Sequence, residues 1–387
     1  MYDCIIIGAG PAGLMASIAL GPNKKVLIIE KNESAGKKLL ITGGGRCNVT
    51  NLKSNNDFLN EIEYNKKYLY SAINTFGPYD IYNFFESNGV LLKEEEDNKI
   101  FPVSNKSKDI LEILIRNINA EINYNEEVIG ISSGEVVTNK NVYKTKNIIV
   151  STGGTSFKNT GSTGDHIGFA EMLKQPIIPL YPAEVGIILN NQPDLAGTSI
   201  ENVEIKYLNI ISTGNLMFTH KGLSGSSIMK LSEHIYKNDN KEIVIDLLPD
   251  LSKEELIDII NNYDREKEVV TLLNEYFSKR FSSYLTNKLN INKKIKSLSK
   301  VEIDNIIDIL KSLAFNVKAT ENIDKAYVTG GGIDLKYINS STMESTINKG
   351  IYFVGESLDI HGPIGGYNIT LALSTGYLAG IKIKNNI

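Results

Sequence analysis

The sequence predicts an α/β fold in which one parallel-sheet domain, built from both ends of the chain, carries an inserted domain with a β-barrel and a helical part. Short, continuous apolar runs typical of strands buried on both faces occur at Cys4–Ile7, in "KVLIIEKN" and in "NIIVSTGGTS". A further apolar run followed by glycines lies near the C-terminus, in "GIYFVGESLDIHGPIGGYN". Between these segments the pattern changes to short alternating strands and then to amphipathic helices.

The size and composition of the chain are those of a globular protein with two or three domains. It has 387 residues, of which 42% are hydrophobic and 22% are charged, and domains span roughly 100 to 200 residues. The two cysteines, Cys4 and Cys47, are too few for a disulfide scaffold. Asp3 and Pro11 interrupt the first apolar run, which therefore lacks the pattern of a signal peptide or a membrane span. We expect a soluble cytoplasmic protein without a membrane partner.

The first apolar run is followed by Gly8, Gly10 and Gly13, and then by a helical pattern that ends near Leu20. In a Rossmann-like unit such glycines allow the tight turn, the approach of a pyrophosphate and close packing of the helix on the strand. The spacing alone is weak evidence, because glycine turns also occur for steric reasons. The second strand ends in Glu30, a carboxylate suited to accept hydrogen bonds from an adenosine ribose. Together these residues predict a dinucleotide site.

A second part of the same site is expected from distant segments. The third strand runs into a glycine turn, and the C-terminal strand is followed by glycines that open a helix, whose N-terminus can face the same pyrophosphate. A nicotinamide dehydrogenase needs no such second part, whereas a flavin with its ribityl chain does. The alternative is a glycine-rich turn before a packed helix. The predicted cofactor residues in these segments are Thr152, Gly153, Gly355, Asp359, Gly365, Gly366 and Tyr367.

A glycine-rich loop, "KKLLITGGGRCNVTN", follows the second strand. Lys37, Lys38 and Arg46 give this loop positive charge, which suits a phosphate or the N1 region of a reduced flavin. The alternative interpretation is a flexible surface loop. The pattern indicates Lys38 and Arg46 as cofactor-binding residues.

Several motifs resemble those of the BaiN/RdsA-type family of NAD(P)- and FAD-dependent flavoproteins. In chain order they are "IIIGAGPAG", "KKLLITGGGRCNVTN", "TGGTSFKNTGSTGD", "MFTHKGLSG", "IDLLPD", "VTGGGI" and "GESLDIHGPIGGYN". The similarity covers nearly the whole chain, and "GGGRCN" and "GGYN" are its specific parts. It implies a Rossmann-like, glutathione-reductase-like domain with non-covalent FAD, also contacted by Asn368 and by the backbone around Val128. It further implies reduction of conjugated C=C bonds, in steroid-like molecules or in a uracil of ribosomal RNA.

The predicted domain boundaries follow the change of sequence pattern. Residues 1–184 and 319–387 form the discontinuous FAD-binding domain. Residues 185–318 form the inserted substrate domain, which is β-rich over 185–248 and mainly helical and basic over 249–318. Two capping boxes precede apolar helical stripes in the helical part: Ser252 with Glu255, and Ser299 with Glu302.

One stretch of the insertion, residues 276–300, is strongly basic. It carries seven Lys or Arg and no acid, so with a formal charge of −4 on the whole protein the remaining chain carries −11. A basic patch on an acidic protein is the electrostatic pattern of a polyanion site, and aromatic residues between the cations are suited to stack on bases. The alternatives are a solvated face for the cations and a helix core for the aromatics. The predicted RNA-binding residues are Lys279, Arg280, Lys288, Lys293, Lys294 and Lys296.

The predicted reaction needs a hydride donor and a proton donor. FAD accepts hydride from NADH or NADPH and delivers it to an electron-poor carbon, and an acid protonates the neighbouring carbon. A second complete nucleotide-binding unit is not recognisable, so we expect NAD(P)H to dock transiently at the flavin. The candidate acids are Cys47, His361 and His220, each of which also fits a structural role. His166 and His234 have no clustered ligands, so we expect no metal.

Three functions follow from these observations. The first is an FAD-dependent reductase of a uridine in ribosomal RNA that forms dihydrouridine, which the basic segment and the family resemblance favour. The second is a reductase of a small conjugated ketone, for which the basic segment would be incidental. The third is a flavin-containing electron carrier, or an RNA-binding protein without substrate chemistry of its own.

Overall fold

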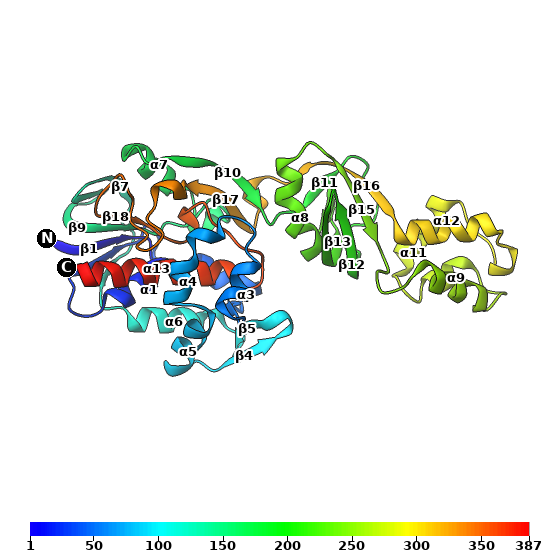
Figure 1. Ribbon diagram of the computed structural model, residues 1–387, viewed down its shortest axis with the longest axis horizontal. Helices are drawn as coiled ribbons and strands as arrows, with labels where there is room; N and C mark the ends of the chain where they lie inside the picture. Colours follow the sequence, from blue (N-terminus) through cyan, green and yellow to red (C-terminus); the bar gives the residue numbers. More distant parts are fainter. Residues whose placement is uncertain (387) are drawn as a thin grey trace. The chain divides into compact units, whose positions relative to one another are not determined.

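The computed structural model describes residues 1–386, and the chain passes from one unit into a second and back. The parallel-sheet unit contains Met1–Tyr181 and the segment from Tyr327 to the end of the described chain. The inserted unit contains Pro182–Ala326. The chain therefore completes its first unit only after the second, as the colours of Figure 1 show.

The parallel-sheet unit is built on a sheet with the strand order β6-β2-β1-β9-β8-β7, and β18 also pairs with β9. The central pairs are parallel, with Ile5 opposite both Leu27 and Ile148. Every residue of β2 is buried, as expected for strands covered on both faces. The strands are β1 (Tyr2–Ile7), β2 (Val26–Ile29), β6 (Glu121–Asn123), β7 (Val128–Ser132), β8 (Glu135–Thr138), β9 (Val142–Val150) and β18 (Ile351–Phe353).

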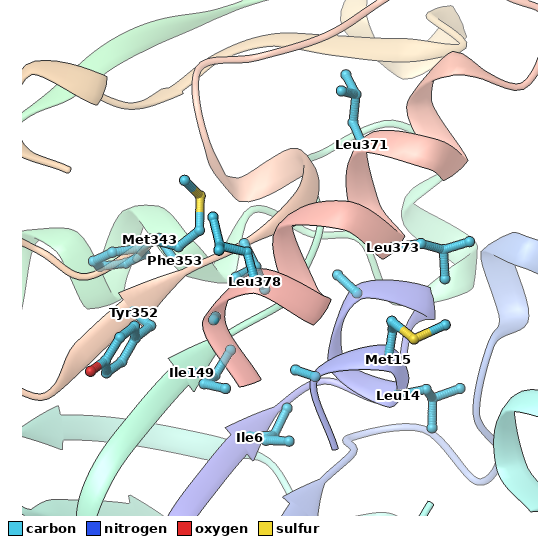
Figure 2. Close-up of a cluster of buried hydrophobic side chains, with 14 of the residues drawn as sticks. Ile6, Leu14, Met15, Ile149, Met343, Tyr352, Phe353, Leu371, Leu373 and Leu378 are labelled. Carbon is cyan, nitrogen blue, oxygen red and sulfur yellow. The ribbon is translucent and has the colours of Figure 1, made fainter. Parts of the chain in front are cut away.

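Helices α1 (Pro11–Leu20) and α13 (Tyr367–Asn386) lie side by side against this sheet (Figure 1). They approach closely because Gly376 and Gly380 have no Cβ, which would meet the backbone oxygens of α1. Figure 2 shows the buried side chains between the two helices and the sheet. The other helices of the unit are α2 (Lys37–Ile41), α3 (Asn55–Asn60), α4 (Tyr70–Thr75), α5 (Pro78–Ser87), α6 (Ser107–Asn117) and α7 (Asp165–Met172).

Two smaller sheets complete this unit. Strands β3 (Thr50–Asn51), β5 (Lys99–Pro102) and β4 (Leu92–Glu95) form an antiparallel sheet, and β10 (Ile177–Ala183) pairs with β17 (Val328–Ile333). Short 3₁₀ turns lie in the connections: η1 (Thr42–Gly45), η2 (Lys66–Tyr68), η3 (Glu96–Asn98), η4 (Lys158–Thr160), η7 (Leu335–Tyr337) and η8 (Gly355–Ser357).

The inserted unit is a closed barrel with the strand order β11-β14-β13-β12-β15-β16, accompanied by helices. Tyr207, Phe218 and Phe281 are among its largest fully buried side chains. The barrel strands are β11 (Ile187–Leu189), β12 (Ser199–Tyr207), β13 (Ile210–Phe218), β14 (Gly222–Ser224), β15 (Glu242–Asp246) and β16 (Leu313–Thr320). The helices and turns are α8 (Ser226–Lys237), α9 (Lys253–Asn262), α10 (Val269–Leu273), α11 (Lys279–Leu289), η5 (Ile295–Ser297), α12 (Lys300–Lys311) and η6 (Ile323–Lys325).

The predicted α/β fold with a β-barrel in the insertion is confirmed. Both predicted capping boxes are present, at the starts of α9 and α12. In each, the serine hydroxyl accepts from the backbone N–H three residues on, while the glutamate accepts from the backbone N–H of that serine. These reciprocal bonds satisfy donors that a helix start otherwise leaves unpaired.

Candidate functional site

A cavity of about 470 Å³ lies in the parallel-sheet unit, with walls formed by segments from both ends of the chain. It opens where β1, β2 and β9 end, the edge at which α/β sheets commonly bind ligands. The sequence-predicted residues that line it are Gly8, Gly10, Glu30, Lys38, Val128, Thr152, Gly153, Gly355, Gly365, Gly366 and Asn368.

The three glycines after β1 have different surroundings. Gly8 has φ +101°, and a Cβ there would lie 2.7 Å from the backbone oxygen of Ser151. Gly10 caps α1, and the space where its Cβ would lie is empty within 4 Å. A Cβ on Gly13 would instead meet the backbone oxygen of Gly8 and Oγ of Ser151. Gly10 therefore leaves room for a ligand at the start of α1, while Gly13 lets the helix pack on the turn.

Glu30 lies at one end of the cavity and is 7% exposed. Its Oε2 accepts a hydrogen bond from the backbone N–H of Ala9 at 2.8 Å, and its Oε1 accepts from the backbone N–H and the Nδ2 of Asn32 at 2.9 and 2.7 Å. Each carboxylate oxygen has more than one acceptor site. The carboxylate is thus fixed by the chain and still able to accept from a ribose hydroxyl.

Lys38 forms an ion pair with Glu356, a residue that is not among the predicted site residues. Its Nζ lies 2.5 Å from Glu356 Oε2 and 2.6 Å from Ser156 Oγ. Glu356 also accepts from the backbone N–H of Thr329 at 3.0 Å. Burial acts to raise the pKa of Glu356, but Lys38 and the backbone N–H groups of Thr329 and Gly154 outweigh it, so the pKa lies below its usual value. The pair ties α2 to η8 across the cavity wall.

The other end of the cavity lies beside the start of α13, where Gly365 has φ +127° and Gly366 has φ +93°. Asn48, Lys99 and Phe101 line the cavity there, and the sequence analysis selected none of them. Their positions could not be read from the sequence because Asn48 lies in a loop, and the pairing of β3 with β5 places Lys99 opposite Asn51.

Two buried polar atoms in the cavity wall have no hydrogen-bond partner among the described residues: Oδ1 of Asn48 and Oγ1 of Thr152. Such atoms are normally satisfied in folded proteins. Together with the open space at Gly10, they make the cavity fit a dinucleotide whose pyrophosphate would lie at the start of α1. The residues present therefore fit FAD.

Arg46 does not line the cavity, and its contact with a cofactor stays a prediction. Its guanidinium forms a salt bridge with Glu95 at 2.9 Å and lies 4.0 Å above the ring of Phe101, which itself lines the cavity. Asn368 does line the cavity, but its carboxamide bonds to both backbone groups of Gly362. Arg46 thus supports a wall residue, and Asn368 fixes the turn before α13.

Two further predicted residues, Asp359 and Tyr367, do not line the cavity and contact other side chains of the unit. Oδ2 of Asp359 accepts hydrogen bonds from the hydroxyl of Tyr64 and the Nδ2 of Asn65, both at 3.1 Å. The ring of Tyr367 stacks on Phe58, with 4.6 Å between the ring centroids. Their contacts to a cofactor stay predictions.

The three candidate proton donors have different surroundings. Cys47 is fully buried, and burial raises the pKa of its thiol to about 12. His361 is 8% exposed, stacks on Tyr64, and has its Nε2 3.4 Å from the hydroxyl of Tyr181. His220 is exposed and belongs to the inserted unit. Which of them donates a proton stays a prediction.

Most of the predicted RNA-binding residues are engaged in ion pairs within the inserted unit. Lys279 and Lys288 are exposed on α11. The other four cations form ion pairs with carboxylates. Of these cations, Lys293 contributes most to lowering the pKa of its partner Glu302, to about 2. The pairs are Arg280 with Asp194 at 2.7 Å, Lys293 with Glu302 at 2.7 Å, and Lys294 and Lys296 with Glu266 at 3.0 and 2.6 Å. The basic segment therefore carries less uncompensated charge than its sequence suggests.

Within residues 1–386, no helix combines the length and apolar character needed to cross a membrane. Over the same residues, no cluster of three or more His, Cys, Asp or Glu side chains is arranged to hold a metal ion.

Comparison with known proteins gives matches along the whole chain. The family described as "HI0933-like protein Rossmann domain" matches residues 2–382. A ribosomal RNA dihydrouridine synthase of Haemophilus influenzae is 29% identical, over 98% of this chain and 98% of that protein. The protein of the same name from Escherichia coli is 28% identical, over 97% and 96%. A 3-dehydro-bile acid delta(4,6)-reductase of Clostridium scindens is 26% identical, over 97% of each.

Solved structures show a similar fold at low sequence identity. A 3-ketosteroid-Δ4-(5α)-dehydrogenase from Rhodococcus jostii is 12% identical, with a TM-score of 0.54 over 99% of this chain and 96% of that one. The quinol fumarate reductase subunit FrdA of Escherichia coli is 15% identical, with a TM-score of 0.52 over 99% of this chain and 70% of that one. These likenesses support the fold.

Proposed function

The chain belongs to the HI0933-like protein family with a Rossmann domain and is an FAD-dependent oxidoreductase, and we propose that it uses NAD(P)H to reduce a conjugated C=C bond. This membership confirms the family resemblance of the sequence motifs. The observation that carries the proposal is the cavity, in which the glycine turn after β1, Glu30 and the glycines before α13 converge from opposite ends of the chain.

The residues of the chain would hold the cofactor in a defined order. Gly8 and Gly10 at the start of α1 would face the pyrophosphate, Glu30 would accept from the adenosine ribose, and Gly365 and Gly366 would lie beside the flavin ring. When bound, FAD supplies hydride transfer at its N5 position. The Lys38–Glu356 pair would keep the wall between these parts rigid.

The proposed overall reaction adds one hydride and one proton to the substrate. In a C=C bond conjugated to a carbonyl, the β carbon gains the hydride and the α carbon gains a proton from an acid. For a uracil these are C6 and C5, and the product is dihydrouracil. NAD(P)H loses the hydride and becomes NAD(P)⁺. Cys47, His361 and His220 stay the candidates for the acid.

The favoured substrate is a uridine of ribosomal RNA. Two relatives that match nearly the whole chain are named ribosomal RNA dihydrouridine synthases. Lys279 and Lys288, exposed on α11, are suited to contact phosphates. The target base would have to be unpaired or flipped out of its helix to enter the cavity.

A small conjugated ketone is the second candidate substrate, and the ion pairs in the inserted unit favour it. Cations paired with carboxylates contribute little to the attraction of a polyanion, since release of counterions requires uncompensated charge. One relative of similar coverage is named a 3-dehydro-bile acid delta(4,6)-reductase. An enone of this kind would need no RNA-binding surface.

The experiment that separates these candidates measures NADH and NADPH oxidation by the purified protein with each substrate class. We expect oxidation to rise with a ribosomal RNA fragment that lacks dihydrouridine, and mass spectrometry to find a uridine heavier by two hydrogen atoms. Turnover of a steroid-like enone without turnover of RNA would establish the second candidate instead. A flavin-containing protein that oxidises NAD(P)H but reduces neither substrate would contradict both.

A further inference from the structure

The end of the cavity beside α13 brings together two polar side chains from different strands and loops. A Cβ on Gly366 would lie 2.9 Å from Oδ1 of Asn48, and a Cβ on Gly365 would lie 3.7 Å from Cε of Lys99. The chain sets this arrangement through β3 and β5, where Asn51 is opposite Lys99. Asn48 and Lys99 both line the cavity, Asn48 next to Gly366 and Lys99 next to Gly365.

The oxygen of the Asn48 carboxamide is unsatisfied in a buried position. Asn48 is 9% exposed, and its Oδ1 has no hydrogen-bond partner in the part of the chain that the structure describes. A carboxamide offers one acceptor and two donors side by side. It is therefore complementary to a ligand that offers an N–H next to a C=O, and leaving it unpaired is unfavourable.

Lys99 supplies the positive charge at this end. Its ion pair with Asp97, at 2.9 Å, lies at the surface, where the Asp97 side chain is 79% exposed. Exposed pairs of this kind are weak, so the ammonium group can turn toward a carbonyl oxygen in the cavity. Of the other lysines of the cavity wall, Lys31 and Lys38 pair with the less exposed Asp165 and Glu356. Lys37 pairs with Glu33, whose side chain is 75% exposed.

We propose that Asn48 and Lys99 form a recognition site for an imide, an N–H group flanked by two carbonyls. This inference rests on the proposed function, because two molecules of that reaction carry an imide: the pyrimidine part of the flavin ring and the uracil base. Asn48 would pair with the N–H and one carbonyl, and Lys99 would donate to a carbonyl oxygen. A steroid-like enone has a carbonyl but no imide N–H.

The experiment uses the full-length protein with three variants. Asn48→Leu removes both hydrogen-bonding functions, and Asn48→Asp keeps the shape while removing the N–H donors, in case the first variant folds poorly. Lys99→Met removes the charge. Lys93→Met is the matched control, because Lys93 lies in the neighbouring strand β4, has the same 35% side-chain exposure and also forms a 2.9 Å ion pair, but belongs to no part of the cavity wall in the described chain.

Two measurements distinguish the sources of the imide. If the site holds the flavin, the Asn48 and Lys99 variants raise the dissociation constant for FAD at least tenfold and shift the midpoint potential of the bound flavin, while Lys93→Met changes neither. If it holds the uracil, FAD affinity stays within twofold of wild type, and KM for the RNA substrate rises at least tenfold while KM for an enone is unchanged. Either result supports the proposal.

The result that overturns it is wild-type behaviour of folded Asn48→Asp and Lys99→Met proteins in both measurements. Wild-type protein is tested first, since failure of the wild type to bind FAD would contradict the proposed function itself. Normal FAD binding and turnover by the wild type, with unaffected variants, would contradict only the imide site. Circular dichroism and thermal unfolding check that each variant is folded.

Discussion

Two ion pairs, one in each unit of the molecule, differ in burial and in surroundings. In the parallel-sheet unit, Lys38 and Glu356 form a pair whose side chains are 24% and 20% exposed, and the pair helps to shape a cavity wall. In the inserted unit, Lys294 and Lys296 share Glu266, whose side chain is 61% exposed. Buried pairs are costly to break, whereas surface pairs contribute little. The inserted unit also has a buried pair, Lys311 with Asp246 at 2.6 Å, so what distinguishes the Lys38–Glu356 pair is its place in a cavity wall.

The largest expected effect comes from the glycines of the turn after β1. Gly13→Val should lower the free energy of unfolding by about 3 kcal/mol and abolish FAD binding, because its side chain would meet Gly8 and Ser151. Gly10→Ala is the control for packing, since the position of its Cβ is open. It should keep wild-type stability but bind FAD more weakly. Urea unfolding and FAD titration measure both, and equal stability of the two variants would contradict the assigned roles.

Breaking the buried pair should have the next largest effect. We expect Glu356→Gln to lower the free energy of unfolding by about 2 kcal/mol at pH 7, because Lys38 loses its partner in a mostly buried position. Lys294→Gln, in the exposed pair of the inserted unit, should change it by less than about 0.5 kcal/mol. Thermal or urea unfolding of both variants makes the comparison directly.

The pH dependence of the free energy of unfolding gives a second test of the same variant. The folded pKa of Glu356 is lowered, so its contribution is present above the unfolded value near 4.5 and is lost as pH falls through the folded pKa. Wild type should therefore lose more stability than Glu356→Gln on acidification below about pH 4.5. Parallel stability curves for the two proteins in this range would show that the pair does not favour the ionised carboxylate.

A buried histidine of the first unit should give an effect of similar size at milder pH. His166 is fully buried, and burial lowers its pKa to about 4, although Glu356 and Asp165 partly oppose the shift. Its neutral form is favoured by folding, so its contribution is present above the unfolded pKa near 6.5 and is lost between there and about 4. Over this interval, wild type should lose about 2 kcal/mol more stability than His166→Gln. His220→Gln, at an exposed position of the inserted unit, is the control.

The smallest effect on stability is expected at the exposed cations of α11. Lys279→Gln with Lys288→Gln should leave unfolding unchanged within about 0.5 kcal/mol. If RNA is the substrate, this double variant should bind RNA more weakly and lower the slope of affinity against salt by about two. Lys294→Gln with Lys296→Gln should change the slope less, because Glu266 already compensates those charges. If wild type and the two double variants show the same dependence of RNA affinity on salt, α11 does not contact the RNA.

The sequence predicted best those elements whose local pattern matches their burial. The apolar runs of β1, β2 and β9 are buried strands, and the capping boxes mark the true starts of α9 and α12. These features depend on neighbouring residues in the chain, so periodicity and capping chemistry are sufficient to find them.

The parts that the sequence did not predict depend on pairing between distant segments. The Lys38–Glu356 ion pair joins residues from the two ends of the chain. Lys99 reaches the cavity because β5 pairs with β3, and this register is not visible in a single sequence. Arg46 was expected at the cofactor from its charge and from the family resemblance; its guanidinium contacts Glu95 and Phe101, and its contact with a cofactor stays a prediction. Charge alone does not specify which partner a side chain selects.

The proposed function requires that the cavity of the parallel-sheet unit holds FAD. Titration of purified, flavin-depleted protein with FAD tests this most directly. We predict saturable binding of one FAD per chain, with a change in flavin absorbance, and weaker binding by folded Gly10→Ala protein. A folded wild-type protein that does not bind FAD, or a Gly10→Ala variant with unchanged affinity, would contradict the assignment of this cavity.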